Sequence, residues 1–164
     1  MRRPAAPVAL TSRVRIDSRA VNALNTIYRW ATALVVAMVV VQIGAAGWGA
    51  FSAAQDLPKD TKYISGKQWD DFFSFHTGFG YIVFIASIVL LILALAARRP
   101  KRTKIFAGVL VLLVVVQILL AWAAEDHHWV GPFHAINAFL ILGVSVGLAQ
   151  FAWRRPDAAA AAAA

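Results

Sequence analysis

Residues 105–124 read IFAGVLVLLVVVQILLAWAA, a stretch with one strongly polar side chain, Gln117, and no charge. A helix that crosses a bilayer needs about 20 predominantly apolar residues, so this stretch predicts a transmembrane helix. Three further stretches of the same kind lie at residues 30–51, 72–97 and 132–153. The chain is 60% apolar with a mean hydropathy of +0.67, which is typical of an integral membrane protein. We therefore predict an all-α fold, a transmembrane four-helix bundle.

The basic residues gather at one end of the predicted spans. Thirteen of the sixteen Lys and Arg residues precede the first span, connect the second to the third, or follow the fourth. The other three, Lys59, Lys62 and Lys67, lie between the first two spans. Cytoplasmic loops of membrane proteins are enriched in Lys and Arg. We therefore expect a multi-pass protein of the cell membrane with both termini in the cytoplasm.

The net charge of +8 is thus mainly a sign of topology. A protein that binds nucleic acid carries its charge on one soluble face, whereas these charges lie between long apolar runs. The expected partner is the lipid bilayer and not nucleic acid, and a secondary role in holding anionic lipid stays open. The chain has no cysteine, which excludes disulfides, thiolate metal sites and a cysteine nucleophile. It also lacks a glycine-rich phosphate loop and an HExxH motif.

The chain divides into three parts. Residues 1–27 predict a basic cytoplasmic arm, and residues 28–155 predict the transmembrane domain. Residues 156–164 are a low-complexity tail that ends in alanines.

The two halves of the transmembrane domain are similar in sequence. The first span contains VVVQIGAAGW and the third VVVQILLAWA, while the second contains FHTGFGYIVFIAS and the fourth FHAINAFLILGVS. The shared positions are a glutamine, a histidine, a small residue four positions later and a serine eleven positions later. These pairs are Gln42 and Gln117, His76 and His134, Gly80 and Ala138, and Ser87 and Ser145. We expect two helical hairpins related as parallel repeats about an axis along the membrane normal.

Such an axis places His76 opposite His134. The first is 22 residues from Arg98 and the second is 20 residues from Arg154. At about 1.5 Å per residue, both histidines lie roughly 30 Å from the cytoplasmic boundary, near the external face. An ionisable residue inside a span is costly and marks a functional site by default.

Two facing imidazoles can share one haem iron, because its axial positions lie on opposite faces of the porphyrin. The second ring nitrogen of each histidine would donate to a carbonyl or hydroxyl and fix the tautomer. Gly80 and Ala138, one helical turn from the histidines, would leave room for the porphyrin. We therefore expect a b-type haem with His76 and His134 as iron ligands. Gln42 and Gln117 are expected at the same site, and the expected function is electron transfer with an external, quinol or subunit partner.

Other interpretations of the histidine pair stay open. Each histidine can make a structural hydrogen bond, for instance to Gln42 or Gln117. The chain would then be a non-catalytic accessory subunit of a larger membrane complex, such as a respiratory complex. Another metal or a proton-transfer role is a third interpretation. A small carrier or channel fits poorly, because no span carries an acidic residue. These residues do not decide whether the chain is an enzyme.

A second pair, His127 and His128, lies in AEDHHWVG between the third and fourth spans. Together with nearby carboxylates it offers ligands for zinc or copper. Adjacent histidines rarely bind one ion together, so we expect an exposed polar loop. Aromatic residues at span ends predict anchors at the membrane surface. They are Tyr28, Trp30, Trp69, Trp122, Trp129 and Trp153.

Residues 69–150 resemble an uncharacterised bacterial family of four-helix membrane proteins, a numbered domain of unknown function. The resemblance rests on FHxxxGY, a basic loop, VVQxLLA and an HxxNA opening to the last span, here with Asn137. The layout is also similar to one half of haem A synthase or a small cytochrome b, in which histidines on the second and fourth helices hold haem b. Only His76 and His134 map onto that pattern. Because the chain lacks the second half, the cysteines and a glutamate within a span, the resemblance implies haem binding and not haem A synthesis.

Overall fold

The computed structural model describes residues 18–60 and 64–154. Its elements are α1 (Ser18–Asp56), α2 (Gly66–Ala96), α3 (Lys101–Asp126), a short 3-10 helix η1 (His128–Val130) and α4 (Gly131–Trp153). No strand occurs in this part of the chain. The four α-helices are long and apolar enough to cross a membrane. The prediction of an all-α fold with four such helices is therefore confirmed.

The helix boundaries differ from the predicted spans mainly at two ends. Helix α1 begins at Ser18, so residues 18–27 of the predicted arm are helical. The rest of that arm and the predicted tail lie outside the described residues. Helix α2 begins at Gly66, before the predicted start at residue 72, because Ser65 and Gln68 form a capping box. The side chain of each residue accepts a hydrogen bond from the backbone N–H of the other.

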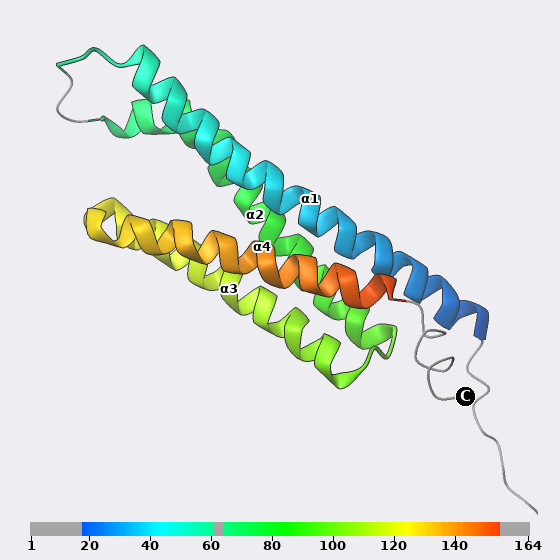
Figure 1. Cartoon of the computed structure of the whole chain (residues 1–164). Helices are drawn as coiled ribbons and strands as arrows, with labels where there is room; N and C mark the ends of the chain where they lie inside the picture. Colours follow the sequence, from blue (N-terminus) through cyan, green and yellow to red (C-terminus); the bar gives the residue numbers. More distant parts are fainter. Residues whose placement is uncertain (1–17, 61–63, 155–164) are drawn as a thin grey trace, which may run out of the picture.

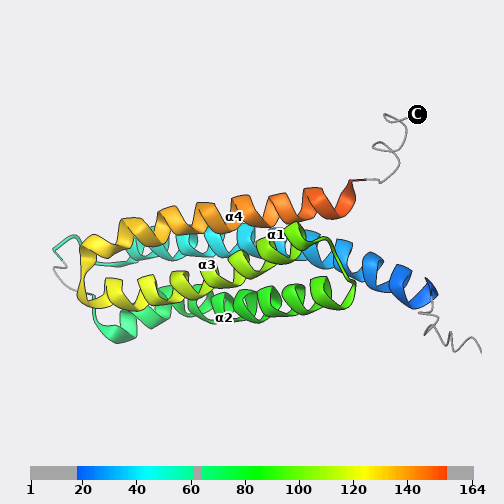
Figure 2. The ribbon, with the colours of Figure 1, turned by 90° about the horizontal axis from the view of Figure 1, so that it is seen from below.

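The helices form two hairpins, α1–α2 and α3–α4, which pack side by side (Figure 1). Each helix contacts two others: α1 packs on α2 and α4, and α3 packs on α2 and α4. Figure 2 shows the four helices running along roughly the same direction. We call the end with the α2–α3 connection the basic end, and the end with the α1–α2 and α3–α4 connections the loop end. The hairpins lie close together towards the basic end and separate towards the loop end (Figure 1).

In every helix, four buried residues follow the same spacing of four, three and four positions. This spacing places a continuous stripe on one helix face, as in left-handed helix bundles. The stripes consist of Tyr28, Thr32, Val35 and Val39 in α1; Val83, Ser87, Leu90 and Ala94 in α2; Thr103, Ala107, Leu110 and Val114 in α3; and Ile141, Ser145, Leu148 and Ala152 in α4. All four stripes occupy the half of the bundle nearer the basic end. Among the described residues, the loop-end half has no comparable stripe of buried side chains.

Each stripe contains one serine or threonine. A buried hydroxyl needs a hydrogen-bond partner, and three of the four find it in the carbonyl of their own helix. Thr32 donates to Arg29 O at 2.6 Å, Ser87 donates to Phe84 O at 2.7 Å, and Ser145 donates to Ile141 O at 2.7 Å. Because these bonds stay within one helix, small polar side chains fit between close-packed helices without a partner across the interface.

Candidate functional site

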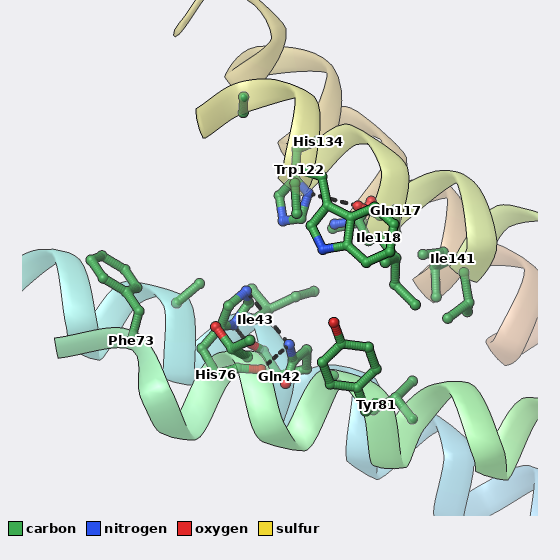
Figure 3. Close-up of a pocket in the computed structure, with 18 of the residues that line it drawn as sticks. Gln42, Ile43, Phe73, His76, Tyr81, Gln117, Ile118, Trp122, His134 and Ile141 are labelled. Atoms are coloured by element: carbon green, nitrogen blue, oxygen red, sulfur yellow. Dashed lines mark hydrogen bonds between the residues drawn. The ribbon is translucent and has the colours of Figure 1, made fainter. Parts of the chain in front are cut away.

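A cavity of about 340 Å³ lies in the loop-end half of the bundle, between the two hairpins (Figure 3). All four helices line it, and the lining is mostly apolar. Its floor is formed by Val39, Val83, Val114 and Ile141, the residues at which the four buried stripes end. The cavity therefore begins where the core stops and the hairpins separate.

His76 from α2 and His134 from α4 face each other across this cavity (Figure 3). Their ring centroids are 6.3 Å apart and their planes make an angle of 66°. Both side chains are partly buried. The spatial pairing of these two histidines is the arrangement expected from the sequence.

Each imidazole contacts the backbone carbonyl oxygen of a glutamine on the other helix of its own hairpin. Nδ1 of His76 lies 3.0 Å from Gln42 O, and Nδ1 of His134 lies 3.2 Å from Gln117 O. A carbonyl oxygen can only accept, so Nδ1 carries the proton in both rings and Nε2 carries a lone pair. In Figure 3 the second nitrogen of each ring points into the space between the hairpins. Both rings therefore present a potential ligand atom to the cavity.

The side chains of the two glutamines make different contacts. Gln42 Nε2 donates to His76 O at 2.7 Å and lies 3.5 Å from His76 Nε2, while its Oε1 is buried without a hydrogen-bond partner in the described part of the chain. Gln117 Oε1 accepts from Asn137 Nδ2 at 2.7 Å. Asn137 Nδ2 also donates to Leu113 O at 2.9 Å. The amide of Gln42 thus contacts a histidine, whereas that of Gln117 is held by Asn137.

All six residues predicted for the site line this one cavity, including the small residues Gly80 and Ala138. The structure gives Gly80 a specific neighbour, because a Cβ built there would lie 3.0 Å from Gln42 Nε2. The absence of a side chain at Gly80 therefore makes room for the Gln42 amide. Space for a porphyrin, the reason expected from the sequence, stays a prediction.

Some residues that line the cavity were not predicted for the site. Trp69 and Trp122 were expected as membrane-surface anchors, yet both line the cavity. The signal for Trp122 is its helical spacing: Ile118, Trp122 and Glu125 lie on one face of α3 at intervals of four and three. Glu125 is the one charged residue among the described residues that line the cavity.

The second histidine pair is not part of a larger cluster of metal-binding side chains in the described part of the chain. Among the described residues, no group of three or more His, Cys, Asp or Glu side chains could hold a metal ion. His127 and His128 are exposed and lie where α3 ends and η1 begins. This agrees with the expectation of a polar loop and gives no support to a zinc or copper site there.

Residues 42–124 match a family of unknown function, DUF6220. The match spans half of the chain. The chain belongs to this family. The predicted membership in an uncharacterised family is therefore confirmed, although the matched region starts and ends earlier than residues 69–150. It includes Gln42, His76, Gly80 and Gln117 but stops before His134.

No curated protein and no solved structure matches the chain. The resemblance to haem A synthase or a small cytochrome b therefore stays a prediction.

Proposed function

We propose that this chain binds one b-type haem between His76 and His134 and exchanges electrons with an external, quinol or subunit partner. One observation carries the proposal. Two histidines from different hairpins face each other across a cavity, and each has its Nδ1 engaged by a carbonyl. Nε2 of each ring carries a lone pair and points into the space between the hairpins, and that of His76 also lies 3.5 Å from the Gln42 amide nitrogen, which would have to yield to a metal.

The spacing of the rings fits a shared metal centre. Two metal–imidazole bonds of about 2 Å, with about 1 Å from each nitrogen to its ring centre, put the centroids about 6 Å apart. The observed separation is 6.3 Å. The angle of 66° between the planes is no obstacle, because each ring can rotate about its own metal–nitrogen bond.

The ligand count favours haem over a bare metal ion. A zinc site needs three or four protein ligands, and no such group exists among residues 18–60 and 64–154. A porphyrin supplies four ligands itself and needs only two from the protein. The cavity volume of about 340 Å³ lies within the range of small-molecule sites, and its apolar lining suits a macrocycle.

The residues of the chain would each contribute a distinct effect. The backbone carbonyls of Gln42 and Gln117 accept hydrogen bonds from Nδ1–H of the two histidines. These bonds fix the tautomer and would make each Nε2 a stronger metal ligand. The apolar floor excludes water from the inner side of the site. A bound haem would supply one-electron chemistry in this environment.

We further propose that both termini lie in the cytoplasm, that the loop end faces outward, and that the two hairpins are parallel repeats in the cell membrane. The positive-inside pattern supports this orientation. The two equivalent His–Gln bonds support the repeat. A haem at this depth would lie more than about 20 Å from the basic end by helix rise. Its redox partner would therefore act from the outside or from within the membrane.

The test is visible absorption of the protein purified from cells supplied with iron and haem precursor. A Soret band and a sharp α-band on reduction are expected. His76→Ala and His134→Ala should each abolish the paired-histidine spectrum. His127→Ala is the matched control, because this histidine is exposed at the loop end and should leave the spectrum unchanged. A colourless wild-type preparation would reject the proposal.

A second candidate function is an accessory subunit of a larger membrane complex, with a structural histidine pair. It is favoured by the contacts between Gln42 and His76, which join α1 to α2 without any ligand. In that case, wild-type protein should co-purify with a fixed set of membrane proteins. Substitution of both histidines should leave this set unchanged.

A further inference from the structure

Three arginines surround Phe151 near the basic end of α4. Arg99 Nη2 donates to Phe151 O at 3.4 Å. The guanidinium carbons of Arg102 and Arg154 lie 4.9 Å and 5.6 Å from the centre of its ring. Arg29 joins this group from α1, since its Nε donates to Ala152 O at 2.8 Å. We call Arg29, Arg99, Arg102 and Arg154 the arginine cluster.

The described acidic residues lie far from the arginine cluster. They are Asp56, Asp60, Asp70, Asp71, Glu125 and Asp126, all at the loop end. The one ion pair in the described part of the chain, Lys67 with Asp71, is also there. The last carbonyls of α4 carry only a partial negative charge. The charge of four guanidinium groups is therefore left largely uncompensated by the residues described.

The cluster also has hydrogen-bond donors without partners. Arg99 Nε and Tyr28 Oη are both buried and make no hydrogen bond with the described residues. The Arg99 guanidinium lies over the Tyr28 ring, 5.0 Å from its centre. The side chains of Arg102 and Arg154 are exposed, and their guanidinium groups lie over aromatic rings, which leaves the N–H edges open. An anion with several acceptor oxygens could bind the open N–H edges of Arg102 and Arg154.

The position of the cluster indicates which anion it meets. It lies at the basic end of four helices that are long and apolar enough to cross a membrane, which is where lipid headgroups would lie. Trp30 and Trp153 pack against each other beside it and are exposed, as expected of aromatic residues at a membrane surface. Arginine forms paired hydrogen bonds with phosphate oxygens. We propose that the arginine cluster binds the headgroup of an anionic phospholipid.

The experiment measures lipid retention by the purified full-length protein. It is incubated in detergent with an equimolar mixture of phosphatidylglycerol and phosphatidylcholine, and bound lipid is measured by native mass spectrometry. We expect severalfold preferential retention of phosphatidylglycerol. Equal retention of the two lipids by wild-type protein would overturn the proposal without any variant.

Two double variants locate the site. Arg102→Gln with Arg154→Gln removes the two exposed guanidinium groups and should abolish the preference. Lys59→Gln with Lys67→Gln removes the same charge at the loop end and should leave it intact. If the loop-end variant loses the preference and the arginine variant keeps it, the proposal is wrong. Helix content by circular dichroism verifies that both variants are folded.

A final part of the experiment distinguishes binding of a phospholipid from binding of free phosphate. Inorganic phosphate, at the concentration of the lipid phosphate, should not displace bound phosphatidylglycerol. Displacement by inorganic phosphate alone would overturn the assignment to a lipid. None of these outcomes depends on whether haem is bound at the other end of the bundle.

Discussion

At the scale of single residues, the candidate site depends on amide groups as much as on histidines. The hydrogen bonds from the two histidines to the backbone carbonyls of Gln42 and Gln117 are equivalent. The side chains of the two glutamines, however, have different partners. Asn137 is buried and holds Gln117, whereas the corresponding position in α2 is Phe79. Without an asparagine there, Gln42 turns its amide to His76 and leaves its own Oε1 unpaired.

Replacing Asn137 with alanine should therefore destabilise the protein. The change removes two hydrogen bonds and leaves the oxygen of Gln117 without its donor. The expected cost is about 1 kcal/mol, as for other interhelical bonds in membrane proteins. Thermal unfolding in detergent measures it. Asn22→Ala, at an exposed position of α1, is the control and should unfold at the wild-type temperature. A similar midpoint for both variants would contradict the role of Asn137.

At the scale of elements, Gly49 is the glycine of the α1–α2 hairpin with the closest neighbours on the facing helix. A Cβ at this position would lie 2.7 Å from Phe72 O and 2.7 Å from the ring of Phe73. A backbone oxygen in a helix cannot move aside cheaply. In contrast, a Cβ at Gly47 would meet no atom within 4 Å.

Gly49→Ala should thus push α1 and α2 apart and lower the unfolding temperature, with a cost of about 1–3 kcal/mol typical of overpacking. Gly47→Ala adds the same methyl group to the same helix in open space. It should be neutral or slightly stabilising, because alanine has the higher helix propensity. Equal stability of the two variants would show that the hairpin packs less closely at Gly49 than described.

At the scale of the whole molecule, the bundle is closed at one end and open at the other. Arg29 and Arg99 reach from α1 and the α2–α3 connection to carbonyls of α4, and Arg99 also donates to Asn25 Oδ1 at 3.0 Å. These bonds tie the hairpins together at the basic end. The cavity occupies the other half, where no described residue makes a comparable bond between hairpins.

The proposed orientation can be tested cleanly, because the chain contains no cysteine. A membrane-impermeant maleimide added to intact cells should label Lys59→Cys at the loop end and spare Lys101→Cys at the basic end. Both positions are exposed, so both should react after lysis. Labelling of Lys101→Cys alone in intact cells would show that the orientation is the opposite of the one proposed. A redox partner would then act from the opposite side of the membrane.

The four helices could be predicted from the sequence because the cause is local. A run of about 20 apolar residues without charge has one favourable environment, and its backbone must bond to itself there. The start of α2 was not predicted, because the capping box of Ser65 and Gln68 places it at Gly66, before the apolar run.

The facing histidines were predicted only through the similarity of the two hairpins. By itself, neither FHTGFGY nor FHAINAF says which residue lies opposite. The ring separation of 6.3 Å, the floor at Val39, Val83, Val114 and Ile141, and the turn of Gln42 towards His76 came from the tertiary structure alone. They depend on the angle at which the hairpins separate. That angle results from many weak packing contacts and from arginine bonds between residues far apart in the chain, which no local stretch of sequence encodes.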